Sequence, residues 1–331
     1  IIKLKSSTEL IEHIDGSEYQ LIVNNKSHEF FEIHKSIARI PSVVISHNAS
    51  DPFNRLVIDN QWLFDLVMTV GRAHEKLLRE NGLIVPSGLF INAAKDPIEL
   101  LVRSALRRRL IFVGRLSDEK GLPLLLAGFE LARSRLPDLN LELEVIGDGA
   151  PELTIRREGV HFLGRLSHSE IQSRLLESDY LVLPSSTEGM PFAILDAMSA
   201  GVPCIGSDIT GVNEIISDQV NGLLFELEGY AQHREIIDQW LTADSVRAHF
   251  NNNVEHLAAC IIKACDRSLG EWQQLSAAAQ NTIAHTYSER SAKTLNLSRL
   301  EPFLRNTPRQ KLIICTTAIP RGSLHEASLG A

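Results

Sequence analysis

Residues 181–206 have the sequence LVLPSSTEGMPFAILDAMSAGVPCIG, and this stretch decides the fold class. Its opening apolar run ends at Pro184, which is typical of a buried parallel strand that stops at its carboxyl end. After a short loop, Pro191 is expected as the first residue of a helix, where its missing N–H costs nothing. Gly201 then ends the helix, and a second strand follows. A strand, a helix and a further strand in this order predict an α/β protein with a parallel sheet.

The same stretch predicts an anion site, because the helix begins where a parallel strand ends. The free N–H groups and positive dipole of a helix start favour a phosphate. Glu188 lies at the mouth of the loop, and Asp196 lies eight residues further on, about 12 Å along a helix that rises about 1.5 Å per residue. One acid could therefore bind a sugar and the other a ribose, with a diphosphate between them. Read from the spacing alone, the alternative is a helix-end charge and a solvated helix residue.

The composition fits a globular protein with two domains. Of the 331 residues, 44% are hydrophobic and 22% are charged, which is enough apolar material for two separate cores. The net charge of −8 excludes a nucleic-acid binder that works through a broad basic field. No apolar run reaches the roughly 18 residues of a membrane helix. The four cysteines have no C-x-x-C spacing, so we expect reduced thiols and a cytoplasmic location, or one at the inner face of the membrane.

The chain divides into segments of different character. The first, 1–107, alternates strand and helix signals, but it lacks the apolar strand and glycine-rich turn that open a nucleotide-binding sheet. It is therefore predicted to be an incomplete Rossmann-like domain. The second, 108–288, is predicted to be a complete nucleotide-binding α/β domain with a helical insertion near 229–253. A last helix, 289–306, and a strand-like tail, 307–331, follow.

Two cations follow the predicted strand 109–113 in the sequence VGRLSDEKG. Arg115 can fork onto two phosphate oxygens, and Lys120, five residues later, adds a point charge. Two cations after a strand end are thus suited to bind a diphosphate. Two solvated surface charges are the alternative interpretation of the same residues.

Local signals are weaker elsewhere. Ser167 and Glu170 have the spacing of a capping box at the start of a helix. The pair Asn221-Gly222 predicts a hairpin-like turn.

The segment TEGMPFAILDAMSAGVP resembles the E-x7-E segment of retaining family-4 glycosyltransferases of the GT-B class, with Asp196 replacing the usual second glutamate. The G-R-x4-K-G spacing around Arg115 and Lys120 is similar to theirs as well. This resemblance is specific from about residue 110 to 226 and weak from 40 to 92. It implies a GT-B fold, in which two Rossmann-like α/β domains face a cleft, with the N-terminal domain incomplete and the last helix crossing back to it.

The resemblance also implies roles for single residues. Arg115 and Lys120 would hold the donor diphosphate, and Glu188 would contact the hydroxyls of the donor sugar. Asp196 would bind the ribose, and His47, which follows PSVVIS, would face the reacting sugar from the first domain. The loop of Gly211 would lie near the donor. Further donor contacts are expected from Gly114, Gly147, Leu163, Gly189, Met190 and Pro191.

The implied activity is transfer of a hexose, with retention of configuration, from a UDP-, GDP- or ADP-sugar to a hydroxyl of a glycan, lipid or polysaccharide precursor. The sequence has no D-x-D pair, so we expect neither a metal nor another cofactor. The two acids are too far apart for the covalent route of retaining glycosidases. The expected partners are the donor and a sugar or lipid-linked acceptor, with peripheral membrane association. The alternatives are an inactive or binding-only module of a larger protein and a nucleotide-sugar epimerase of the same fold.

The tail contains KLIICT, a strand signal at 311–316, followed by a loop. Together they resemble the opening strand of a glycosyltransferase N-terminal domain. Three interpretations remain open: a tandem of such modules in one polypeptide, a circular permutation, and a frayed tail with a chance apolar run.

Overall fold

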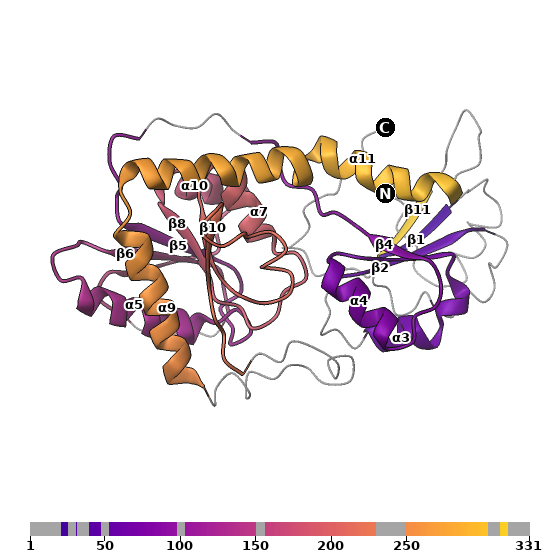
Figure 1. The fold of residues 1–331 in the computed structure, drawn as a ribbon, viewed down its shortest axis with the longest axis horizontal. Coiled ribbons are helices and arrows are strands. Elements are labelled where there is room, and N and C mark those ends of the chain that lie inside the picture. Colours follow the sequence, from indigo (N-terminus) through magenta and orange to yellow (C-terminus); the bar gives the residue numbers. More distant parts are fainter. Residues whose placement is uncertain are drawn as a thin grey trace. The chain divides into compact units, whose positions relative to one another are not determined.

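The computed structural model describes residues 21–25, 31, 40–47, 53–97, 103–149, 156–229, 249–303 and 312–316. The chain forms two compact units, each with its own sheet (Figure 1). Unit 1 comprises residues 1–91, 233–240 and 292–331, and unit 2 comprises residues 92–232 and 241–291. Residues 92–107, assigned to the first domain from the sequence, thus lie in unit 2. The helix expected at 7–13 falls outside the described residues.

Within the described residues, unit 1 has a five-stranded parallel sheet in the order β11-β1-β2-β3-β4. Its elements are β1 (Leu21–Asn25), β2 (Ser42–Ser46), α3 (Phe53–Asp59), a 3-10 turn (Gln61–Leu63), β3 (Leu66–Thr69), α4 (Arg72–Glu80), β4 (Ser87–Leu89) and β11 (Leu312–Thr316). The sequence predicted these strands and α4, but not α3.

The strands of unit 1 are apolar because both faces of a parallel sheet are covered. Alternate residues form one core cluster, which the end of α11 (Glu289–Leu300) completes with Leu300. Asn296 fastens that helix to the segment that follows β4, donating to the carbonyl of Ile91 and accepting from its N–H, both at 2.9 Å. Arg299 donates to the carbonyl of Leu89 at 2.5 Å. Polar bonds to the main chain thus hold α11 against unit 1.

β11 belongs to the sheet of unit 1 although it lies near the C-terminus. It pairs in parallel with β1, with Leu312 opposite Leu21 and Thr316 opposite Asn25. A five-residue parallel ladder is regular structure, so the frayed-tail interpretation of this segment is wrong.

Unit 2 has, within the described residues, a six-stranded parallel sheet in the order β10-β9-β8-β5-β6-β7. Its strands are β5 (Arg109–Val113), β6 (Glu142–Ile146), β7 (Val160–Gly164), β8 (Tyr180–Leu183), β9 (Cys204–Ser207) and β10 (Gly222–Phe225). Its helices are α5 (Leu122–Arg135), α6 (His168–Glu177), α7 (Phe192–Ser199), α9 (Phe250–Cys265), α10 (Leu269–Thr282) and a π turn, Ile283–Tyr287.

A turn is present where the sequence predicted one at Asn221-Gly222, since residues 219–221 form it, but it does not join β9 and β10 as a hairpin. Gly222 opens β10, which pairs in parallel with β9, opposite Cys204. Parallel neighbours need a crossover between them, so a tight hairpin cannot join these strands. Asn221 instead stabilises the connection, because its side chain accepts from the N–H of Ser217 at 2.8 Å and donates to the carbonyl of Ile215 at 3.1 Å.

Two helices of unit 2 begin with reciprocal caps. The predicted capping box at Ser167 and Glu170 forms at the start of α6. A second box, Ser268 with Glu271, starts α10, which the sequence analysis did not predict. Each serine accepts from the glutamate N–H, and each glutamate accepts from the serine N–H, so two of the free amides at each helix start are satisfied.

The helices α5 and α9 pack directly against each other beside the sheet (Figure 1). The contact requires a glycine, because a Cβ added at Gly128 would lie 2.9 Å from the side chain of Leu257. The packing therefore depends on the absence of one methyl group.

A buried ion pair joins three segments at the amino-terminal edge of the unit 2 sheet. Arg103 contacts Asp179 at 2.6 Å, and both side chains are at most 10% exposed. The guanidinium carbon lies 4.4 Å from the ring centroid of Trp272, whose indole N–H donates to the carbonyl of Asp179 at 2.8 Å. Burial lowers the pKa of Arg103, and the Asp179 carboxylate opposes that shift. The pair therefore ties the segment that precedes β5 to α10.

We expect Arg103→Ala to lower the stability of the protein by about 3 kcal/mol, because it leaves a buried carboxylate without its cation. Urea denaturation followed by circular dichroism measures this loss. Arg135→Ala is the matched control, since its pair with Glu255 is solvent-exposed and should contribute little. Equal destabilisation by the two substitutions would contradict this assignment.

Candidate functional site

The candidate site lies where the strand order of unit 2 reverses. β5 is followed outward by β6 and β7 on one side and by β8, β9 and β10 on the other. In open α/β sheets, ligands bind beyond the carboxyl ends of the strands at this switch point. The loops that leave β5 and β8 there are 114–121 and 184–191, which hold most of the residues that the sequence predicted.

Glycines allow these loops to pack main chain against main chain. A Cβ at Gly121, which has φ 71°, would lie 2.0 Å from the carbonyl oxygen of Pro184. A Cβ at Gly147 would lie 1.8 Å from the carbonyl oxygen of Gly114. Neither position has room for a side chain. Gly114 and Gly147, predicted as donor contacts, therefore have a structural role that the sequence did not indicate.

Backbone hydrogen bonds hold the same loops together. The N–H of Ser186 donates to the carbonyl of Glu119 at 2.9 Å, which joins the loop after β8 to the loop after β5. The N–H of Leu116 donates to the carbonyl of Asp148 at 2.8 Å, which joins the loop after β5 to the loop after β6. The edge of the sheet is thus a fixed frame for the side chains that it carries.

Lys120 and Glu188 meet inside this frame. The lysine Nζ lies 2.6 Å from Oε1 of Glu188, and the side chains are only 22% and 7% exposed. The hydroxyl of Ser185 donates to the same oxygen at 2.7 Å. Within the described part of the chain, Oε2 of Glu188 has no hydrogen-bond or ion-pair partner. The structure therefore brings together two predicted site residues and adds Ser185, which the sequence analysis missed.

Arg115 lies on the same loop as Lys120 but is held differently. Its side chain is 69% exposed, and it pairs at 3.1 Å with Glu119, four residues further along the same loop. Glu119 is a second residue that sequence reasoning missed, although its spacing of four from Arg115 is the signal that could have revealed it. Arg115 and Lys120, the two cations predicted to hold a diphosphate, are thus each paired with an acid in this structure.

The loop after β8 leads into α7, which begins one residue later than predicted. Pro191 is the N-cap, with φ −71° and ψ 113°, and Phe192 is the first helical residue. Asp196 lies partly exposed in the second turn. Gly189 and Met190 precede the cap, and the carbonyl of Gly189 would lie 2.3 Å from a Cβ at Gly211, which has φ 87°. The Gly211 loop is therefore packed against the candidate site.

Leu163 occupies an irregular position at the carboxyl end of β7. Val145 pairs with Phe162 and Ile146 pairs with Gly164, so Leu163 is an extra residue in the ladder. Such bulges redirect a side chain and are frequent near sites. The sequence predicted a donor contact at Leu163, but only the pairing register of β6 and β7 reveals the bulge.

His47 lies in unit 1, directly after β2. Its Nε2 contacts Oδ1 of Asn25, at the carboxyl end of the neighbouring strand β1. A buried polar group lies next to it: the hydroxyl of Ser46 donates to Oδ1 of Asn54 at 2.5 Å, and Nε2 of His74 lies 3.1 Å from the same oxygen. Unit 1 thus gives His47 a polar neighbourhood of its own, while Lys120 and Glu188 belong to unit 2.

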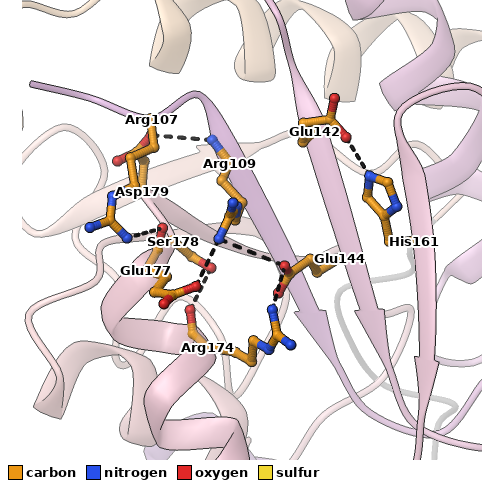
Figure 2. A network of polar contacts seen from close by, with 9 residues as sticks. All are labelled: Arg107, Arg109, Glu142, Glu144, His161, Arg174, Glu177, Ser178 and Asp179. Atoms are coloured by element: carbon orange, nitrogen blue, oxygen red, sulfur yellow. Dashed lines mark hydrogen bonds and ion pairs between the residues drawn. The ribbon is translucent and has the colours of Figure 1, made fainter.

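A denser charged cluster lies at the other edge of the unit 2 sheet, and Figure 2 shows it. The buried carboxylate of Glu144 lies 3.2 Å from Arg174 and 3.8 Å from Arg109. Arg109 also pairs with Glu177 at 2.9 Å, and its N–H donates to Asp179 at 3.2 Å. These residues come from the start of β5, the middle of β6, the end of α6 and the turn before β8. They tie the amino ends of the strands together, away from the edge where ligands bind.

The described residues contain no group of three or more His, Cys, Asp or Glu side chains placed to hold a metal ion. Three of the cysteines, Cys204, Cys260 and Cys265, are buried free thiols. Burial raises the pKa of Cys260 and of Cys265 to about 12, so both stay protonated near neutral pH. No helix among the described residues is long and apolar enough to span a membrane.

Comparison with known proteins relates residues 107–242 to a family. Residues 107–242 match the family model for glycosyl transferases group 1. The chain is 34% identical over 137 residues to a GDP-mannose-dependent alpha-mannosyltransferase of Corynebacterium glutamicum, covering 40% of this chain and 31% of that protein. It is 32% identical over 156 residues to the amylovoran biosynthesis glycosyltransferase AmsK of Erwinia amylovora, covering 41% and 37%. The chain spans 31% to 41% of the length of the first four curated relatives.

Solved structures share the fold over most of the chain. The pneumococcal O-GlcNAc transferase GtfA, in complex with UDP and GlcNAc, matches with a TM-score of 0.68 at 15% identity, over 89% of this chain and 59% of that one. HepE of Anabaena, in complex with UDP-glucose, matches with a TM-score of 0.67 at 16% identity, over 89% and 82%. Residues 107–242 therefore resemble the glycosyl transferases group 1 family, and the chain has the α/β fold of the GT-B glycosyltransferases, as the sequence predicted.

We expect Gly121→Ala to destabilise the protein by at least about 2 kcal/mol, since the new methyl group strains a left-handed backbone and overlaps a carbonyl. Thermal unfolding measures the loss. Gly270→Ala in α10 is the control, because a Cβ there meets nothing within 4 Å and alanine favours a helix. An unchanged midpoint for Gly121→Ala would show that the two loops are not in close contact.

Proposed function

We propose that this chain is a retaining family-4 glycosyltransferase that moves a hexose from a nucleotide sugar to a hydroxyl acceptor. One observation supports the proposal above the others: Lys120 and Glu188 meet, largely buried, at the switch point of the unit 2 sheet. A cation and a carboxylate at this place are suited to a ligand that carries both a diphosphate and sugar hydroxyls.

The diphosphate would be bound by exchange of partners. Lys120 would turn from Glu188 to a phosphate oxygen, and Arg115 would leave Glu119. The exposed Arg115–Glu119 pair contributes little, so its loss costs little. The amino end of α7 would add N–H dipoles from the other side of the site. Positive charge would then be in place where negative charge develops as the bond to the sugar breaks.

Glu188 would accept hydrogen bonds from the hydroxyls of the donor sugar, and Asp196 from those of the ribose. The nucleotide base would lie near the Leu163 bulge in β7 and near Gly147, which directly follows β6. Recognition through main-chain atoms leaves the base open among uridine, guanosine and adenosine. Names of relatives are consistent with this range, since one is GDP-mannose-dependent and one structure holds UDP-glucose.

The transfer step follows from these contacts. The bond between the anomeric carbon and the diphosphate oxygen breaks, and the acceptor oxygen bonds to that carbon on the same face. The acceptor proton passes to a phosphate oxygen of the leaving group. His47 would hydrogen-bond near the reacting sugar. No D-x-D pair is present in the sequence, so the cationic side chains would neutralise the diphosphate in place of a metal.

The acceptor class is a sugar or lipid-linked hydroxyl in cell-envelope polysaccharide synthesis, at the cytoplasmic side of the membrane. AmsK, one of the relatives, is named for amylovoran biosynthesis, which fits this class. Further glycosyltransferase modules in the same polypeptide remain part of the proposal. A binding-only module is the second candidate, because the family match is confined to residues 107–242.

We expect one of UDP-glucose, GDP-mannose and ADP-glucose to raise the melting temperature of the chain. At a hundredfold excess over its Kd, that donor should increase the free energy of unfolding by about 2.7 kcal/mol. Lys120→Ala should weaken this effect at least tenfold in Kd, and Glu188→Gln should abolish release or transfer of the sugar. Lys263→Ala, on the exposed face of α9, is the control. Binding without turnover would favour the binding-only module, and no shift with any donor would reject both candidates.

We expect EDTA to leave the turnover rate unchanged, because Lys120 and Arg115 supply the positive charge at the leaving group. Sugar release or transfer is measured before and after treatment with the chelator, and again after Mg²⁺ or Mn²⁺ is added. A loss that either metal restores would contradict the metal-independent mechanism.

A further inference from the structure

Glu188 has two donors on one oxygen, and the proposed function removes one of them. In this structure Oε1 accepts from Lys120 at 2.6 Å and from Ser185 at 2.7 Å. When a diphosphate binds, the ammonium of Lys120 is drawn toward the phosphate charge. The carboxylate of Glu188 is only 7% exposed, so water replaces a lost partner poorly, and a buried charge that loses its donors is strongly disfavoured.

Ser185 is built to stay in place while Lys120 moves. It is fully buried and lies two residues after the end of β8. Its own carbonyl accepts from the hydroxyl of Ser207, in the neighbouring strand β9, at 2.8 Å. The serine is thus anchored on the sheet, whereas lysine has a flexible four-carbon stem.

Both donors reach Oε1, which leaves the other oxygen for a ligand. Oε2 of Glu188 has no partner among the described residues. It is also not one of the fully buried polar atoms without a partner, so part of its surface is exposed to solvent. A carboxylate fixed through one oxygen presents the other in a defined direction. The arrangement separates the two tasks of holding Glu188 and binding a sugar hydroxyl.

We propose that Ser185 is a positioning residue that keeps the Glu188 carboxylate aimed at the donor sugar after Lys120 has moved to the diphosphate. This inference rests on the proposed function and assigns to that site a residue outside the predicted set. The adjacent Ser186 provides a contrast, because its hydroxyl donates at 3.3 Å to the carbonyl of Glu119 and not to Glu188.

The test compares binding of the sugar nucleotide with binding of the nucleotide alone. For UDP-glucose with UDP, GDP-mannose with GDP, and ADP-glucose with ADP, titration calorimetry gives the extra affinity due to the sugar. We expect Ser185→Ala to lower kcat/KM about tenfold and to remove most of this extra affinity. Affinity for the nucleoside diphosphate should stay within about twofold of wild type, since Lys120 and Arg115 are intact. Ser186→Ala should resemble wild type in both.

Two further variants keep the test decisive if Ser185→Ala folds poorly. Ser185→Cys has nearly the same shape but a weak donor, so it should lose activity as Ser185→Ala does. Ser185→Thr keeps the hydroxyl and should restore most of the activity.

A double-mutant cycle tests whether Ser185 acts through Glu188. Added to Glu188→Gln, Ser185→Ala should cause no further loss of sugar-dependent affinity. The role of Ser185, but not the proposed function, would be overturned by either of two results. One is an equal loss of affinity for the nucleotide and the sugar nucleotide, and the other is additive losses in the cycle. A wild-type chain that binds none of the donors would overturn the proposed function, and this inference with it.

Discussion

The candidate site depends on main chain packed directly against main chain at the carboxyl edge of the unit 2 sheet. Gly121 lies against the carbonyl of Pro184, and Gly147 lies against the carbonyl of Gly114. These contacts bring the loops after β5 and β8 close enough for a lysine on one loop to reach a carboxylate on the other. A side chain at Gly121 would overlap the carbonyl of Pro184 and push these two loops apart.

Burying the charged pair of Lys120 and Glu188 costs free energy, and the rigid packing of the two loops offsets this cost. Removing two charges from water is unfavourable unless the geometry is good and further hydrogen bonds are made. Ser185 makes one of these bonds from the end of a buried strand. A ligand that brings its own negative charge and hydroxyl groups could replace each of these internal partners with one of its own. The free protein thus already holds the charges that the proposed reaction requires.

Charge density by itself does not identify a site in this protein. The group around Glu144, Arg109 and Arg174 is as rich in ionisable side chains as the loops at the switch point. It lies at the amino ends of the strands, where it closes the sheet. The position of a cluster relative to strand direction, rather than its size, separates a structural network from a candidate site.

The sequence by itself determined the α/β class, most strands and the capping box at Ser167, and it singled out Lys120 and Glu188 as candidates, because these follow from short-range patterns and motif spacing. It did not determine α10, the parallel pairing of β10, the bulge at Leu163 or the pairing of β11 with β1. Nor did it indicate Ser185, which is one of two adjacent serines in its loop. Only the tertiary structure decided these features, since each depends on which distant main-chain and side-chain atoms the folded sheets bring within hydrogen-bonding distance.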